Sequence, residues 1–304
     1  MADLTTELCG IRLANPTILA SGVLGTSKAL IRRVARNGAG AVTIKSISME
    51  PRGGHSNPTI LTFDAGMINA VGYSNFGMEE AEREYADLSD VGCPVIGSLI
   101  GTNAEEFARM AERMALLPFA ALELPLSCPH TPGYGTLAGQ STPEATAEIT
   151  AAVRKVTNKP IIIKVSPNVP GIGEIAKAAR DNGADAITAV NSMGPGMLIH
   201  IEARAPMLAF KMGGVTGAAL HAVALRCVYD IHQSVELPII GTGGVRDGRT
   251  AIAMLMAGAT AVGVGSAVQD EGMRVFDKIA REMSAWMDEN GVKSVKELIG
   301  AAHG

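Results

Sequence analysis

The feature that most constrains the fold is a regular alternation of short apolar segments with longer amphipathic segments along the whole chain. Each apolar segment is followed by Gly, Asn or Ser and then by residues with helical periodicity. This order is typical of parallel βα units, because a parallel strand needs a crossover before the next strand. Eight evenly spaced units without a dinucleotide-binding fingerprint favour a closed (β/α)8 TIM barrel over an open doubly wound sheet.

The expected elements are bounded by these patterns. The expected strands are 17–20, 41–45, 94–99, 120–124, 160–165, 186–190, 237–241 and 261–265. The expected helices are 28–37, 79–88, 104–116, 143–156, 173–182, 217–232, 247–257 and 270–290. Three of these helices end at Asn37-Gly38, Asn182-Gly183 and Ala257-Gly258, where glycine supplies a left-handed C-cap before the next strand.

Composition narrows the class of protein. A chain of 304 residues with 47% hydrophobic content suits one barrel, so we expect a single domain over residues 1–304. A net charge of −4 and 4% aromatic residues argue against nucleic acid as a partner. Cys9, Cys93, Cys128 and Cys227 form no C-x-x-C pair, which argues against a metal site and favours the reducing cytoplasm. Neither a signal peptide nor an apolar run of the ~20 residues needed to span a membrane is visible.

Three connections are too long to be simple turns. They cover residues 47–77, 127–142 and 192–216, after the second, fourth and sixth expected strands. Loops at the carboxyl end of barrel strands build the active sites of this fold. We therefore expect these long βα-loops to cover a pocket at that end.

Glycine-rich loops follow the last two expected strands. They read Gly241-Thr242-Gly243-Gly244 and Gly263-Val264-Gly265-Ser266. Glycine lets backbone N–H groups approach an anion, and barrels commonly bind phosphate at these two loops. The simpler alternative is that the glycines only form tight turns.

Two lysines occur within apolar strand patterns. Lys45 follows Ala41-Val42-Thr43-Ile44, and Lys164 follows Ile161-Ile162-Ile163. A buried ammonium needs a partner, which could be an electron-rich ring, an anionic substrate or a neighbouring carboxylate.

Together with further motifs, these residues resemble the class 1 dihydroorotate dehydrogenases, most closely class 1B, and the pyrimidine-reducing domain of dihydropyrimidine dehydrogenase. The resemblance spans nearly the whole chain. Its motifs are Ala20-Ser21-Gly22, Lys45-Ser46, Met49-Glu50-Pro51-Arg52, Asn69-Ala70-Val71-Gly72, Leu126-Ser127-Cys128-Pro129-His130, Pro167-Asn168-Val169, Asn191-Ser192, Gly213-Gly214-Val215-Thr216-Gly217 and the two glycine loops.

The resemblance implies an FMN-dependent oxidoreductase that interconverts a dihydropyrimidine and a pyrimidine, most simply dihydroorotate and orotate in pyrimidine biosynthesis. Cys128 would be the base that removes a proton while the neighbouring ring carbon delivers hydride to FMN. The implied FMN-binding residues are Ala20, Ser21, Gly22, Lys45, Ser46, Lys164, Gly217, Gly243, Gly244, Gly265 and Ser266. The implied substrate-binding residues are Lys45, Asn69, Val71, Gly72, Tyr73, His130, Asn191 and Ser192.

The class 1B resemblance also implies an iron–sulfur flavoprotein subunit as electron-transfer partner, within a homodimer or heterotetramer. The chain departs from the dihydroorotate pattern at Pro125, His130 and Tyr73. Pro125 replaces a substrate-binding asparagine and offers no side-chain hydrogen bond. Two alternatives therefore stay open, namely a flavoenzyme acting on another cyclic amide or pyrimidine, and a barrel subunit without turnover.

Overall fold

The computed structural model describes residues 2–127 and 140–304, and its centre is a closed barrel of parallel strands. Their order around the barrel is β10-β15-β16-β3-β4-β7-β8-β9. The strands are β3 (Thr17–Leu19), β4 (Ala41–Thr43), β7 (Val95–Ser98), β8 (Ala121–Pro125), β9 (Ile161–Val165), β10 (Ala186–Ala189), β15 (Ile239–Thr242) and β16 (Ala261–Val264). All eight overlap the expected strands, so the predicted (β/α)8 barrel is confirmed.

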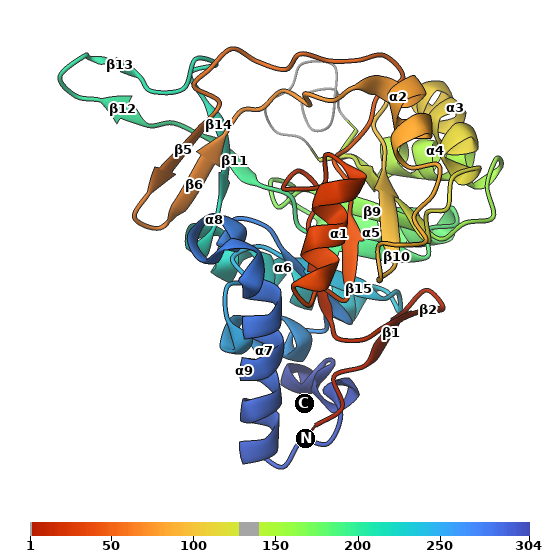
Figure 1. Cartoon of the computed structure of the whole chain (residues 1–304), viewed down its shortest axis with the longest axis vertical. Helices are drawn as coiled ribbons and strands as arrows, with labels where there is room; N and C mark the ends of the chain where they lie inside the picture. The colour runs from red at the N-terminus through yellow and green to blue at the C-terminus, as the bar shows by residue number, and fades with distance from the viewer. Residues whose placement is uncertain (1, 128–139) are drawn as a thin grey trace.

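Helices alternate with the barrel strands and pack around them (Figure 1). They are α1 (Lys28–Arg36), α2 (Gly77–Glu84), α3 (Ala104–Ala115), α4 (Pro143–Arg154), α5 (Ile172–Asp181), α6 (His221–Ser234), α7 (Gly248–Met256), α8 (Ala267–Glu271) and α9 (Val275–Glu289). Four of them begin at side-chain caps that accept a backbone N–H of the first turn, namely Ser27, Asn103, Thr142 and Asp247.

The helix expected over 79–88 lies at Gly77–Glu84 and so ends four residues early. In two further helices that differ from the sequence prediction, glycine is the cause. The helix expected from residue 217 begins at His221, because Gly217 has φ +86 and is followed by a 3-10 turn, Ala218–Leu220. The helix expected over 270–290 is divided into α8 and α9 at Gly272, whose φ is +64. A left-handed residue cannot continue a right-handed helix, so each helix is interrupted there.

The barrel interior is apolar at its amino end. Inward side chains of the barrel strands cluster with Leu8 and Leu13 of an N-terminal hairpin, β1 (Thr6–Leu8) and β2 (Ile11–Leu13). The strand residues of this layer are Ile18, Ala41, Ile96, Ala121, Ile162, Ala186, Ile240 and Ala261. The hairpin, which the sequence did not predict, therefore closes the barrel at this end.

The next inward layer is polar. Because side chains on a strand alternate between its faces, the residues two positions further along also face the interior. They include the buried side chains of Thr43, Ser98, Glu123, Lys164 and Thr188. The interior thus changes from apolar to polar towards the carboxyl end of the strands.

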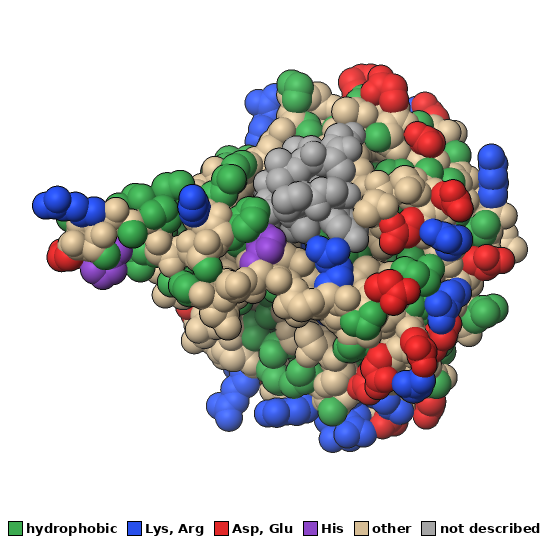
Figure 2. Space-filling view, turned by 90° about the horizontal axis from the view of Figure 1, so that it is seen from above, with side chains coloured by type: hydrophobic (Ala, Val, Ile, Leu, Met, Phe, Trp, Pro, Cys, Tyr) green, Lys and Arg blue, Asp and Glu red, His purple; other side chains and the backbone are tan. Residues whose placement is uncertain are grey.

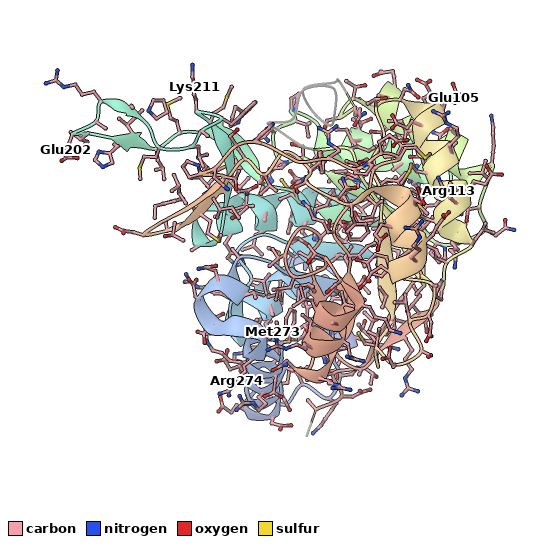
Figure 3. The ribbon with its side chains drawn as sticks, turned by 45° about the horizontal axis from the view of Figure 1, so that its top comes forward. Glu105, Arg113, Glu202, Lys211, Met273 and Arg274 are labelled. Carbon is pink, nitrogen blue, oxygen red and sulfur yellow. The ribbon has the colours of Figure 1, made fainter. Side chains whose placement is uncertain are left out.

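A second sheet grows out of two of the long connections. Its order is β11-β14-β6-β5, comprising β5 (Ile60–Phe63), β6 (Gly66–Asn69), β11 (Met193–Gly196) and β14 (Gly213–Thr216). A short hairpin, β12 (Ile199–His200) and β13 (Ala205–Pro206), projects beside it as an arm (Figure 1). Figure 3 shows Glu202 at the outer end of this arm and Lys211 nearer the barrel.

Within residues 2–127 and 140–304, no helix combines the length and apolar character needed to cross a membrane.

Because the β1–β2 hairpin closes the amino end of the barrel, truncating one of its buried side chains should destabilise the protein. Leu13 is 1% exposed, so Leu13→Ala leaves a cavity and should lower the free energy of unfolding by about 2–5 kcal/mol. Leu116, which is 85% exposed, is the matched control, and Leu116→Ala should change it by less than about 0.5 kcal/mol. Denaturant unfolding measures both values. Equal effects of the two substitutions would contradict this role of the hairpin.

Candidate active site

A cavity of about 510 Å³ lies at the carboxyl end of the barrel. Its walls come from the ends of β3, β9, β10, β15 and β16 and from β6 and β14 of the second sheet. This volume lies within the range of roughly 300–1,000 Å³ typical of small-molecule sites. Seen from above, acidic and basic side chains are interspersed over the rounded body, and hydrophobic side chains gather along the projecting arm (Figure 2).

The cavity brings together residues that are far apart in the sequence. Those expected to contact a cofactor are Ala20, Ser21, Gly22, Lys45, Ser46, Lys164, Gly217, Gly243, Gly244, Gly265 and Ser266. Those expected to contact a substrate are Asn69, Val71, Gly72, Tyr73, Asn191 and Ser192. Cys128 and His130 lie outside the described residues. Shared location is consistent with these roles, which stay predictions.

The two glycine loops suit a phosphate group. Gly243 has φ +138 and Gly244 has φ +69, and a Cβ at Gly244 would lie 2.7 Å from Cβ of His221. The His221 ring braces this loop, because its Nδ1 lies 2.9 Å from the carbonyl oxygen of Gly243. At Gly265 a Cβ would approach only Ala20, at 3.7 Å, so the backbone there borders open space. Both loops therefore expose backbone to the cavity without side chains in the way.

The buried lysine of β9 has a carboxylate neighbour. Lys164 Nζ lies 3.8 Å from Glu123 Oε1, with side-chain exposures of 7% and 3%. Thr188 Oγ1 donates a hydrogen bond of 2.8 Å to Glu123 Oε2. The carboxylate alternative raised by the sequence is thus present for Lys164, although Glu123 itself was not singled out. Its signal was an acidic residue within the apolar run of the fourth strand.

Lys45 follows β4 and faces an aromatic ring. Its Nζ lies 5.9 Å from the ring centroid of Tyr73, within the distance of a cation–π contact. Tyr73 has φ +57 and follows Gly72, whose φ is +74. This left-handed turn directs the tyrosine into the cavity beside the lysine.

Three hydroxyl groups form a cluster at the cavity wall. Ser46 Oγ lies 2.8 Å from Ser98 Oγ, and Ser21 Oγ lies 3.1 Å from Ser46 and 3.3 Å from Ser98. Ser98 was missed by the sequence analysis, although a serine at an inward position of a buried strand is a polar signal. Each hydroxyl can donate only one hydrogen bond, so the contacts among the three restrict the orientation of Ser21 and Ser46, which line the cavity.

Side-chain amides at the other wall are also oriented. Asn191 Nδ2 donates to Ser127 Oγ at 3.0 Å, and its Oδ1 accepts from the backbone N–H of Ser192 at 2.8 Å. Asn69 Nδ2 lies 3.3 Å from the carbonyl oxygen of Gly214. Oriented donors and acceptors in a partly apolar pocket give selectivity for a ligand with a matching pattern of polar groups.

The cysteines of the described part do not suit general-base chemistry. Cys9, Cys93 and Cys227 are free thiols that lie outside the cavity lining. Burial raises the pKa of Cys9 and of Cys93 to about 12, and that of Cys227 to about 11. A thiol with such a pKa is almost fully protonated near neutral pH. Of the chain's four cysteines, Cys128 alone remains a candidate base.

Pro125 is the last residue of β8 and pairs in register with Lys164. It is buried, and it is absent from the cavity lining formed by the described residues. The ladder continues past it, since the N–H of Leu126 donates to the carbonyl oxygen of Lys164 at 3.1 Å. The proline is therefore tolerated because it stands where the strand ends.

Comparison with known proteins identifies the family. A family model described as dihydroorotate dehydrogenase matches residues 3–287. The chain is 46% identical to the dihydroorotate dehydrogenase B (NAD(+)) catalytic subunit of Methanothermobacter thermautotrophicus, over 99% of this chain and 98% of that protein. It is 45% identical to the subunit of the same name from Pyrococcus abyssi, over 98% and 99%.

A solved structure has the same fold. It is the dihydroorotate dehydrogenase of Eimeria tenella in complex with ferulenol, with a TM-score of 0.85 and 21% identity over 99% of this chain and 89% of that one. The family match and the two full-length relatives show that this chain belongs to the dihydroorotate dehydrogenase family.

Proposed function

We propose that this chain is the catalytic subunit of an FMN-dependent dihydroorotate dehydrogenase, which oxidises dihydroorotate to orotate in pyrimidine biosynthesis. The observation that carries the proposal is the cavity at the carboxyl end of the barrel, where residues from Ala20 to Ser266 meet in a chain of this family. Residues 1–304 would act as one FMN-binding domain.

The residues of the cavity fit FMN. The Gly243-Gly244 and Gly265-Ser266 loops would hold its phosphate, and Lys45 and Lys164 would face its electron-rich ring. When bound, FMN would supply the acceptor for the hydride that leaves the substrate. The serine cluster would hold polar atoms of the ring in place through its hydroxyl groups.

The substrate would lie against the ring, held by Asn69, Asn191, Ser192 and Lys45, with Tyr73 at its edge. The family resemblance adds His130, which lies outside the described residues, to the substrate contacts. Cys128, which follows Ser127 directly, would take the proton from the carbon next to the one that loses hydride. A thiolate suits this step because its pKa can be brought near neutral by its surroundings. The reducing cytoplasm, which we propose as its location, would keep this thiol available.

The electrons would leave through a partner. The relatives from Methanothermobacter thermautotrophicus and Pyrococcus abyssi are named catalytic subunits of NAD(+)-dependent enzymes. We therefore propose an iron–sulfur flavoprotein subunit that passes electrons from this chain to NAD+, in a heterotetramer built on a dimer of this chain.

A second candidate is a related flavoenzyme acting on another pyrimidine or cyclic amide. It is favoured by Pro125, which has no side-chain hydrogen bond to offer, and by Tyr73, whose ring lines the cavity. Unlike either enzyme, a barrel without turnover would purify colourless and would take up no FMN.

Blocking the proposed phosphate loop should abolish cofactor binding. In Gly244→Val the side chain would meet His221 and disfavour φ +69, so the loop should no longer admit phosphate. Gly291→Val is the matched control, because Gly291 has φ +72 but borders open space away from the cavity. Flavin content after reconstitution measures both. Full FMN in Gly244→Val would rule out this placement.

Anaerobic mixing with substrate tests the activity. The FMN-loaded protein should be bleached faster by dihydroorotate than by dihydrouracil or dihydrothymine in a stopped-flow trace. Faster bleaching by another dihydropyrimidine would support the second candidate.

Cys128→Ser should retain FMN and ligand but slow bleaching by orders of magnitude, with partial recovery at high pH, because a serine hydroxyl has a far higher pKa. A wild-type rate in Cys128→Ser would remove this residue from the mechanism.

Restoring the amide at position 125 tests the departure from the family pattern. Pro125→Asn should tighten orotate binding by up to roughly tenfold if one hydrogen bond of about 1.4 kcal/mol is regained. Orotate titration of the flavin spectrum measures the dissociation constant, and denaturant unfolding checks that the barrel is intact. Unchanged or weaker binding in a folded variant would indicate a pocket built for another ring.

A further inference from the structure

Glu123, Lys164 and Thr188 lie on three neighbouring strands beneath the cavity. Lys164 pairs in register with Pro125 of β8 and with Thr188 of β10. Glu123 lies two residues before Pro125, on the same face of β8. The roles described above include Lys164 but leave its buried carboxylate neighbour without one.

Glu123 lies close enough to Lys164 to offset its charge but too far away to form a hydrogen bond with it. The distance of 3.8 Å from Lys164 Nζ to Glu123 Oε1 exceeds the 2.7–3.2 Å usual for a hydrogen bond. Thr188 holds the other carboxylate oxygen at 2.8 Å, and Oε1 accepts no hydrogen bond from the described residues. The carboxylate thus offsets the charge of the ammonium, while the N–H donors of Lys164 remain for acceptors in the cavity it lines.

Stability alone does not account for this arrangement. Replacing a buried ion pair by apolar residues is often neutral or stabilising, and the layer directly below consists of Ala121, Ile162 and Ala186. A pair selected for stability would also be at hydrogen-bond distance with both carboxylate oxygens satisfied. The position of the pair at the cavity floor points instead to an action on the cavity's ligand.

We propose that Glu123 is a positioning residue that balances the charge of Lys164 beneath the cofactor ring, at a distance set by Thr188. This inference rests on the proposed function, because the ring is that of FMN. Two-electron reduction adds negative charge to the ring, which the ammonium favours and the carboxylate opposes. Glu123 thereby holds the reduction potential of the bound cofactor below the value that Lys164 alone would give.

Two substitutions should shift this potential in opposite directions. Glu123→Gln keeps the size of the side chain and an acceptor for Thr188 but removes the negative charge. It should favour reduced over oxidised FMN by about tenfold, which is about 30 mV more positive for a two-electron couple. Thr188→Val should release the carboxylate to close on the ammonium, so the potential should become more negative.

Thr43→Val is the matched control. Thr43 is a threonine of the same polar layer on β4, 2% exposed, and it lies outside the cavity lining. Its replacement removes an equivalent hydroxyl from the barrel interior. We expect the potential of this variant to equal that of the wild type.

A spectroscopic redox titration of the FMN-loaded proteins decides the question, with FMN binding to the apoproteins and denaturant unfolding measured in parallel. Failure of the wild type to bind FMN would overturn the proposed function and this inference together. FMN binding with one common potential for all variants, or shifts of the same sign in both, would overturn the inference alone. If Glu123→Gln does not fold, a negative shift in Thr188→Val that is absent from Thr43→Val supports it, and equal potentials refute it.

Discussion

The parallel register of the barrel strands determines where the functional groups of this protein can lie. Because the strands pair in one continuous ladder, inward side chains fall into layers at successive heights. The layer at the amino end is filled by aliphatic side chains and sealed by the β1–β2 hairpin. A buried charged or hydroxyl side chain costs free energy unless it has a partner. Such side chains therefore lie in the next layer towards the carboxyl end, where a cavity ligand or a neighbouring strand can supply that partner.

This layering explains which features could be predicted from the sequence. Strand positions follow from local runs of β-branched residues, and the two glycine loops follow from glycines at strand ends, so both can be recognised within single segments of the sequence. The second sheet was not, because each of its strands is only four residues long and three of the four contain glycine or proline. Its central pair, β6 and β14, is also separated by more than a hundred residues of sequence. Thr216 pairs with Met67, for example, and no local sequence pattern predicts that pairing.

The polar layer was only partly predicted for a related reason. Lys164 stands out in the sequence because a cation after three isoleucines is unusual, whereas Glu123 and Ser98 are single polar residues within apolar runs. Their importance depends on neighbours contributed by other strands. Thr188 reaches Glu123 across 65 residues of sequence, and Ser98 reaches Ser46 across 52. Contacts between side chains on different strands depend on the strand register, so they can be recognised only in the folded barrel and not in the sequence.

The same layering accommodates two departures from the family pattern without disturbing the barrel. Pro125 occupies a strand end, where the missing N–H costs no interior ladder bond and the chain resumes pairing through Leu126. Tyr73 lies on a left-handed turn of the second sheet's connection, outside the barrel ladder. Neither residue alters the layers that stabilise the barrel, yet one removes a side-chain amide and the other adds an aromatic ring beside Lys45. Residues at such positions can change without loss of the barrel, so a substrate is argued from the residues of the site and not from the fold.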